Sequence, residues 1–353
     1  MQRNIFENTR QWRLFIEAIP YVGREETSEY QHLLYGIELG DLRNRSYTKG
    51  PPFSFLPEYK NPCWLERLQA QYMTEHVNHS FHDPNNIKAR KLYPIYKERL
   101  QRDSYPWRFR CLPYFYLAGV TKSGTTDFIN MLLRHPQLHG PLVKEPMYWN
   151  RRRYPNGVQV GNGTYIGRGT KIEHFPFNSY LALLDYSAHL LNTTNDGRLH
   201  LIGDSSSYLF WEDNGWPSHP GNKGLTVPGY TTAMALHTAQ PDAKLIVLLR
   251  NPTERASLYS EHLNEWLKIF QRKQLLIIKS EDYYRDRMKI LEGTFSFLNI
   301  SDIGNETRSW IERQPPIFKS VYSPMLAKTR NVLDSFFRPF NRRLEDLLHR
   351  QLW

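Results

Sequence analysis

From residue 113 onward, short apolar runs alternate along the chain with amphipathic ones. Four runs are brief, continuous and bounded by polar residues: "YFYLAG" (114–119), "LHLIGD" (199–204), "KLIVLL" (244–249) and "QLLIIK" (274–279). Strands that are buried on both faces have this pattern, whereas "TTDFINMLLRH" (125–135) repeats its apolar residues at helical spacing. The alternation predicts an α/β fold, in which helices flank a P-loop-like, doubly wound parallel sheet.

Apolar stripes at helical spacing identify the helices that would cover this sheet. The stripe in 125–135 consists of Phe128, Met131, Leu132 and His135. The stripe in 257–270 consists of Leu258, His262, Trp266 and Phe270. Residues 323–351 are predicted to form two helical pieces, with Pro339 in the first turn of the second, where proline is tolerated.

Residues 1–105 differ from the rest, because they are polar, aromatic and only weakly periodic. The stretch "KGPPFSFLPEYKNP" (49–62) indicates irregular structure. We therefore predict an N-terminal extension, residues 1–105, that wraps one large domain formed by residues 106–353. A chain of 353 residues is long enough to bury the core of such a domain.

The chain is basic, with 46 Lys and Arg against 35 Asp and Glu, which gives a net charge of +11. This charge favours a polyanionic partner such as nucleic acid, an anionic membrane surface or an acidic polysaccharide, and does not choose among them. No nucleic-acid recognition motif accompanies it, so we expect no nucleic-acid partner. The thirteen histidines show no metal-ligand spacing with the cysteines, so we expect no metal.

Two features favour a secretory compartment. The sequence contains six Asn-x-Ser/Thr sequons, at Asn44, Asn78, Asn162, Asn192, Asn299 and Asn305, and only two cysteines, Cys63 and Cys111. Inert thiols and chance sequons are the alternative interpretation. The sequence has no signal peptide and no apolar run long enough for a membrane helix, so our hypothesis requires an anchor upstream of this start methionine.

The stretch "YLAGVTKSGTTDFINML" (116–132) carries the candidate chemistry. Gly119 and Gly124 have the spacing of a Walker A loop, but Thr125 stands where that loop carries lysine, and Lys122 lies inside the loop. The amides of residues 123–126 can still surround an anion at the helix N-terminus. Lys122 would then approach the anion from the other side, near a bridging oxygen, which suits transfer of the group beyond the phosphate.

Strand–K-[ST]-G-T-[ST]–helix is the 5′-phosphosulfate loop of sulfotransferases, and this sequence resembles one. It is most similar to the Golgi N-acetylgalactosamine 4-sulfate 6-O-sulfotransferase family, which acts on chondroitin sulfate, over roughly residues 50–350. The motifs are "RCLPYFYLAGVTKSGTTDF", "VKEPMYWNRRR", "LLRNPTERA", "WLKIF" with "QLLIIKSEDY", and "FFRPFNRRL". The resemblance implies 3′-phosphoadenosine 5′-phosphosulfate (PAPS) as co-substrate, a sulfated glycosaminoglycan acceptor and the Golgi lumen.

The resemblance also implies roles for the donor side of the site. Lys122 would donate toward the leaving phosphate oxygen, and Arg250 would hold the 3′-phosphate. The 5′-phosphate would be held by Ser123, Gly124, Thr125 and Thr126. Sulfuryl transfer needs charge stabilisation at the leaving oxygen more than covalent help, as phosphoryl transfer does.

On the acceptor side, Glu145 in "KEPMYW" matches the glutamate base of the related glycosaminoglycan enzymes. A surface ion pair is its structural alternative. The cations that follow suit a sulfated sugar: Lys144, Arg151, Arg152 and Arg153. Asp204, Ser205 and Ser206 end a predicted strand, where they either line the acceptor side or cap a helix.

One departure concerns the 3′-phosphate. The family has a serine eight residues after the arginine, but Leu258 stands there, with Ser257 and Ser260 nearby. The simplest interpretation is that an internal stretch is missing between Arg255 and Ser257. We expect weaker donor binding, unless Ser257 or Ser260 substitutes, because each lost charge-assisted hydrogen bond is worth about 1.5–3 kcal/mol.

Three alternatives stay open. A P-loop kinase or NTPase would need lysine at Thr125. A catalytically impaired, glycosaminoglycan-binding isoform would keep the basic cleft without turnover. A heparan sulfate sulfotransferase would share both the lysine loop and the glutamate base.

Overall fold

A computed structural model describes most of the chain after residue 53. The described residues are 54–67, 107–141, 144–152, 159–160, 163–164, 166–167, 170–171, 177–211, 216, 222, 224–255, 258–317 and 325–353. Most of the predicted extension and its boundary at residue 106 lie outside these residues. The division into 1–105 and 106–353 therefore stays a prediction.

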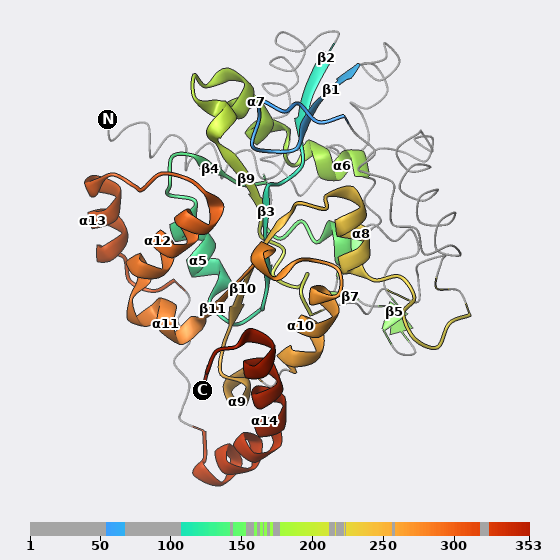
Figure 1. The fold of residues 1–353 in the computed structure, drawn as a ribbon, viewed down its shortest axis with the longest axis vertical. Coiled ribbons are helices and arrows are strands. Elements are labelled where there is room, and N and C mark those ends of the chain that lie inside the picture. Colours follow the sequence, from blue (N-terminus) through green and yellow to red (C-terminus); the bar gives the residue numbers. More distant parts are fainter. Residues whose placement is uncertain are drawn as a thin grey trace.

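The centre of the fold is a five-stranded sheet in which every neighbouring pair is parallel (Figure 1). Its strands are β3 (Phe115–Gly119), β4 (Leu138–His139), β9 (Leu201–Asp204), β10 (Lys244–Leu249) and β11 (Leu275–Lys279). The order is β11-β10-β3-β9-β4, so the chain leaves β3 first toward one edge and later toward the other. All four predicted strands are confirmed, and the two-residue edge strand β4 was not foreseen.

Helices cover both faces, as a doubly wound sheet requires (Figure 1). One face packs against α5 (Thr125–Leu132), α11 (Ser280–Arg285), α12 (Arg287–Leu298) and α13 (Asn305–Arg313). The other packs against α6 (Phe177–Ala182), α7 (Asp185–Thr193), α8 (Thr232–Ala239) and α10 (Tyr259–Leu267). Residues of β10 alternate between the two cores, with Leu245 and Val247 on one side and Ile246 and Leu248 on the other.

The two predicted stripes fare differently. Phe128, Met131, Leu132 and His135 are all buried, so the first is confirmed. Of the second, Trp266 and Phe270 are buried as predicted, whereas Leu258 and His262 are only half-buried. Tyr259 and Leu263 of α10 are buried in their place. The stripe is turned because Tyr259 is anchored by a hydrogen bond from its hydroxyl to the Arg250 carbonyl, 3.0 Å.

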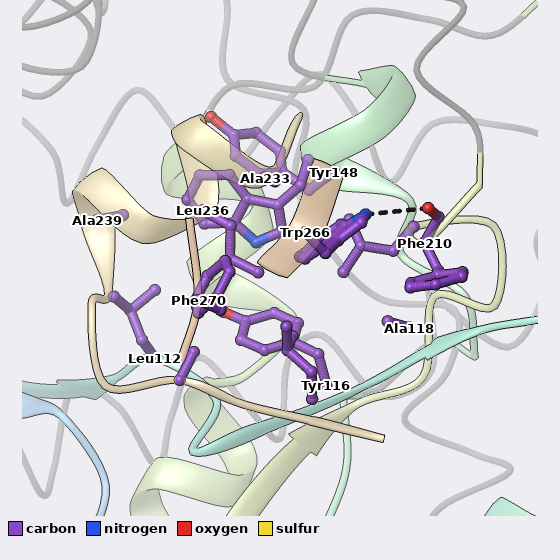
Figure 2. Packing of buried hydrophobic residues seen from close by; sticks show 14 of the residues in the cluster. Leu112, Tyr116, Ala118, Tyr148, Phe210, Ala233, Leu236, Ala239, Trp266 and Phe270 are labelled. Carbon is purple, nitrogen blue, oxygen red and sulfur yellow. Dashed lines mark hydrogen bonds between the residues drawn. The ribbon is translucent and has the colours of Figure 1, made fainter. Parts of the chain in front are cut away.

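Aromatic packing fixes α10 on the sheet. Trp266 stacks on Phe210 and Phe270, and its indole Nε1 donates to the Phe210 carbonyl at 2.9 Å (Figure 2). Phe210 in turn donates its backbone amide to Ala118 in β3 at 2.8 Å. Helix α10 is thereby tied to the carboxyl end of β3, where the candidate loop begins.

The C-terminal residues form one helix, α14 (Ala327–Leu348), which lies along α10 and α9 (Pro252–Arg255) (Figure 1). The prediction of two pieces broken at Pro339 is wrong. Proline removes the amide that would bond Ser335, but both residues are exposed, so water can satisfy that carbonyl. Packing of Phe337, Leu344 and Leu348 holds the helix together across the proline.

A pair of strands joined by a disulfide packs against α7. Strands β1 (Cys63–Arg67) and β2 (Trp107–Cys111) pair antiparallel, and Cys63 and Cys111 are joined by a disulfide. Buried Arg110 lies 3.4 Å from Asp185 at the start of α7 and 3.2 Å from Glu66. Strand β1 lies within the predicted extension, just after the stretch 49–62, whose described residues 54–62 form turns and bends without a helix or strand, as predicted.

The remaining elements are short. They are the π-helix at Tyr148–Arg152, 3-10 turns at Gly197–Leu199 and Arg272–Gln274, and the ribbons β5 (Gln159–Val160) with β6 (Gly163–Thr164) and β7 (Ile166–Gly167) with β8 (Thr170–Lys171). Within the described part of the chain, no helix combines the length and the apolar character needed to cross a bilayer.

Candidate active site

The loop between β3 and α5 is held in an unusual backbone conformation. Lys122 and Gly124 have φ of 67° and 85°, a region that side chains other than glycine rarely adopt. The loop is fixed by hydrogen bonds from the Val120 amide to the Leu248 carbonyl, 2.9 Å, and from the Ser280 hydroxyl to the Ser123 carbonyl, 2.6 Å. Strand β10 and the first residue of α11 therefore hold the loop in shape.

The loop has the features of an anion cradle. The first amides of α5 have no intrahelical acceptor, and Lys122 is exposed beside them. The Ser123 hydroxyl is buried and, among the described residues, has no hydrogen-bond partner. These groups fit a phosphate, because the helix amides and the Ser123 hydroxyl are donors without an acceptor among the described residues. Thr125 and Thr126 stand in the same first turn. Of the amides expected to surround the anion, that of Ser123 is already bonded to the Val120 carbonyl at 3.1 Å.

Glycine is required at position 124 for a second reason. A Cβ atom there would lie 2.5 Å from the Tyr284 hydroxyl at the end of α11. Burial and the charge of Asp127 raise the pKa of Tyr284, and the charges of Arg287 and Arg250 oppose this rise. Tyr284 therefore lies against the loop and within electrostatic reach of Arg250.

A buried acid anchors the same helix. Asp127 accepts hydrogen bonds from the Tyr283 hydroxyl and the Ile317 amide, each 2.7 Å, and lies 3.4 Å from Arg287. These bonds fix α5 against α11, α12 and the chain near residue 317. Because both oxygens of Asp127 already accept these bonds, this carboxylate does not occupy the free amides at the start of α5.

The second loop of the site carries Glu145. Lys144 Nζ and the Ser207 hydroxyl both donate to Oε1 of Glu145, at 2.9 and 2.6 Å. Neither of these bonds involves Oε2. One carboxylate oxygen is thus fixed by two donors, and the bonds among the described residues leave the other without one.

This loop is strained as well. Glu145 and Met147 have φ of 59° and 52°, and residues held in such conformations cost roughly 1–3 kcal/mol each. The Met147 amide donates to the Ser206 hydroxyl at 2.9 Å, which holds the loop on the turn that follows β9. The contact with Ser206 just after β9 offsets part of the strain in this loop.

Behind Ser206 lies a fully buried carboxylate. Asp204 accepts hydrogen bonds from the Ser206 amide and the Tyr180 hydroxyl, both 2.8 Å. Burial raises the pKa of Asp204, an effect that the bonds from Ser206 and Tyr180 oppose and the charge of Glu145 reinforces. Asp204 is completely enclosed; it therefore supports the turn rather than facing an acceptor, and this turn opens no helix among the described residues.

The two loops meet. A Cβ atom at Gly119, the last residue of β3, would lie 3.1 Å from the Ser207 carbonyl, and the Ser207 side chain binds Glu145. Sequence reasoning singled out Asp204, Ser205 and Ser206 but missed Ser207. The only signal for it was its place as the third serine of one run.

At the end of β10, Arg250 Nη2 lies 3.3 Å from Oε2 of Glu254, and Arg330 of α14 pairs with the other oxygen of that carboxylate.

The remaining predicted site residues are placed as follows. Ser260 is buried in α10, and its hydroxyl has no partner among the described residues. Ser257 and the side chains of Arg151 and Arg152 lie outside the described residues, as does Arg153. Ser205 is buried next to Asp204.

Comparison with known proteins identifies sequence relatives. The chain is 25% identical over 373 aligned residues to carbohydrate sulfotransferase 15 from Homo sapiens, covering 84% of this chain and 65% of that protein. It is 24% identical over 276 residues to bifunctional heparan sulfate N-deacetylase/N-sulfotransferase 4 from Mus musculus, covering 68% of this chain and 30% of that protein. These relatives confirm the resemblance to carbohydrate sulfotransferases.

The chain spans about two thirds of the length of its sulfotransferase 15 relatives. That alignment of 373 residues exceeds the 353 residues of the chain, so it contains gaps on this side. No protein-family model matches the chain. In structure it is similar to a sulfotransferase from Alicyclobacillus acidocaldarius, with 23% identity, a TM-score of 0.49, and coverage of 68% of this chain and 97% of that one.

Proposed function

We propose that this chain transfers a sulfuryl group from PAPS to a hydroxyl of chondroitin or dermatan sulfate, at the 6-OH of N-acetylgalactosamine 4-sulfate. One observation carries the proposal. The lysine loop after β3 and the glutamate loop beside β9 are joined through Gly119 and Ser207. A donor cradle and a candidate base therefore stand at adjacent strand ends, where doubly wound sheets bind their ligands.

On the donor side, Lys122 and the amides of residues 124–126 supply positive charge from two directions, whereas the Ser123 amide is bonded to the Val120 carbonyl at 3.1 Å. PAPS, when bound, supplies the activated sulfuryl group. The first turn of α5, with Ser123, Gly124, Thr125 and Thr126, holds the 5′-phosphate. Lys122 stabilises the charge that develops on the phosphate oxygen as the S–O bond breaks.

On the acceptor side, Glu145 is the general base. Its Oε2 takes the proton of the attacking hydroxyl, while Lys144 and Ser207 keep Oε1 in place. The oxygen of that hydroxyl forms the new bond to sulfur as the bond to the phosphate breaks, so the proton ends on Glu145. Lys144, beside the base, supplies a cation for a sulfate group of the acceptor sugar. Arg151 and Arg152, which follow it closely in the sequence, supply two more.

A secretory lumen fits this function. The disulfide between Cys63 and Cys111 needs an oxidising compartment. The three sequons on described residues, Asn192, Asn299 and Asn305, are all exposed. We propose the Golgi lumen as its compartment.

Two other functions have specific support. Similarity to the heparan sulfate N-deacetylase/N-sulfotransferase favours a heparan sulfate acceptor. The gaps in the alignment with sulfotransferase 15 favour an impaired isoform that binds glycosaminoglycan without turnover.

Labelled PAPS and a panel of acceptors separate these functions. The 353-residue chain is incubated with chondroitin 4-sulfate, desulfated chondroitin and N-desulfated heparan sulfate, and label in each polysaccharide is counted. We expect preferential labelling of the 4-sulfated chondroitin, at the 6-OH after disaccharide analysis. Labelling of heparan sulfate alone would identify the other acceptor, and binding without any label would identify the impaired isoform.

A further inference from the structure

Two arginines from distant parts of the chain share one carboxylate. Arg250 follows β10 directly, whereas Arg330 lies in the first turn of α14. They contact different oxygens of Glu254, and all three side chains are partly exposed, by 38%, 41% and 31%. Two guanidinium groups are therefore held around an anion that water can reach.

This cluster borders the donor loop. The Val120 amide of the donor loop donates to the Leu248 carbonyl at 2.9 Å, two residues before Arg250, and the Asn251 amide donates to Glu281 of α11 at 2.8 Å. The same helix carries Tyr284, whose hydroxyl lies 2.5 Å from where a Cβ atom at Gly124 would be. The arginine pair therefore stands beside the phosphate cradle at the carboxyl edge of the sheet. An anionic group of a ligand that fills the cradle would meet it.

The local charges are balanced without a ligand. Asp334 accepts a hydrogen bond from Thr253 and also acts on Arg330, so two cations face two carboxylates. A dianionic phosphate would have to displace Glu254. Exposed ion pairs contribute little to stability, whereas arginine binds phosphate through short, often bidentate, charge-assisted bonds. The exchange therefore favours the phosphate.

We propose that Arg330 is a second ligand of the donor's 3′-phosphate, acting with Arg250 in the place where related enzymes use a serine. Glu254 is the internal anion that occupies this arginine pair until the nucleotide binds. The inference rests on the proposed function, because the ligand is the adenosine 3′,5′-bisphosphate half of PAPS. On this assignment, the Arg330 guanidinium replaces the contact with the 3′-phosphate that the serine makes in the related enzymes.

Calorimetric titration with two probes isolates the 3′-phosphate. The full chain and its Arg330→Gln variant are titrated with adenosine 3′,5′-bisphosphate and with adenosine 5′-monophosphate. We expect Arg330→Gln to weaken bisphosphate binding about tenfold or more, and to leave monophosphate binding within about twofold. The matched control is Arg343→Gln, which removes a similar α14 arginine that pairs with Glu261 of α10; it should change neither.

Glu254→Gln supplies a second variant with the opposite sign. Removing the competing carboxylate should tighten bisphosphate binding severalfold and leave the monophosphate unaffected. If Arg330→Gln and Glu254→Gln both keep the parental ratio of the two affinities, Arg330 is only a surface ion-pair partner, and the inference is overturned. If the parent chain binds neither nucleotide, the proposed function fails, and the inference fails with it.

Discussion

Polar groups differ between the carboxyl ends and the amino ends of the strands in the central sheet, which are called here its carboxyl edge and its amino edge. At the carboxyl edge, Lys122, Glu145 and Met147 all have positive φ, and the Ser123 hydroxyl is buried without a partner among the described residues. At the amino edge, buried polar groups are paired. Strain and unused donors gather where a ligand is expected, which is how functional sites differ from the scaffold.

At the amino end of the strands, buried histidines are paired with groups from other elements. His139 Nε2 lies 2.9 Å from His200 Nδ1, and His200 lies 3.1 Å from Asp196. His135 bonds the Ser301 carbonyl at 2.7 Å. The positive φ at Asn299 belongs to an ordinary helix C-cap. We therefore expect substitutions at the carboxyl edge to change turnover, and substitutions at the amino edge to change stability.

Lys122→Ala should have the largest effect. Loss of the charge at the leaving oxygen is expected to lower kcat by about 10³–10⁵-fold, because nothing else in the loop can replace an ammonium group. Turnover with labelled PAPS and thermal melting are measured together, with Lys289→Ala, an exposed lysine of α12, as control. Parental turnover in Lys122→Ala would contradict the assignment of turnover to the carboxyl edge.

Glu145→Gln should be nearly as severe. The amide keeps the shape and loses the basicity, so kcat should fall by about 10²–10⁴-fold while nucleotide affinity is unchanged. Glu265→Gln is a matched control, because Glu265 pairs with Lys268 at 2.6 Å much as Glu145 pairs with Lys144. A fully active Glu145→Gln variant would leave Glu145 as a surface ion-pair residue only.

Ser207→Ala tests a positioning role. Its hydroxyl bonds Glu145 at 2.6 Å, and a hydrogen bond to a charged group is worth about 1.5–3 kcal/mol. We expect kcat to drop about tenfold or more, with nucleotide affinity close to parental and a melting temperature lowered by the lost bond. Ser207→Thr, which restores the hydroxyl, should recover most of the loss; failure of threonine to rescue would indicate a packing defect instead.

At the amino edge, His139→Gln should change stability alone. Burial and the charge of His200 lower the pKa of His139 to about 3, and Asp196 opposes them; the unfolded value is about 6.5. The unfolded chain therefore binds more protons between these values, so stability falls as pH decreases from about 6.5, by at most about 1.4 kcal/mol per unit from this group.

Melting temperatures between pH 7.5 and 4.5 check this prediction. His139→Gln should flatten the acid side of the curve, with parental turnover at pH 7. An unchanged acid slope would mean that another group controls acid stability. A loss of turnover at pH 7 would contradict the separation of the two edges.

Most of the sheet was predictable because a strand buried on both faces leaves a continuous apolar run, as "KLIVLL" does for Lys244–Leu249. The loop was predictable for a similar reason, since Lys122 and Gly124 are neighbours in sequence. The buried face of α10 was not, because the anchor of Tyr259 is a carbonyl nine residues away. Nor was the unbroken α14, which packing carries across Pro339.

The sequence by itself determined the order of strands and helices, the lysine loop and the candidate glutamate, because each is written in adjacent residues. Only the tertiary structure decided that Ser207 holds Glu145, that Arg330 joins Arg250 on Glu254, and that Cys63 bonds Cys111. These pairs are separated by 48 to 80 residues in the chain. Contacts at such distances follow from how the sheet brings its strand ends together, which no local pattern records.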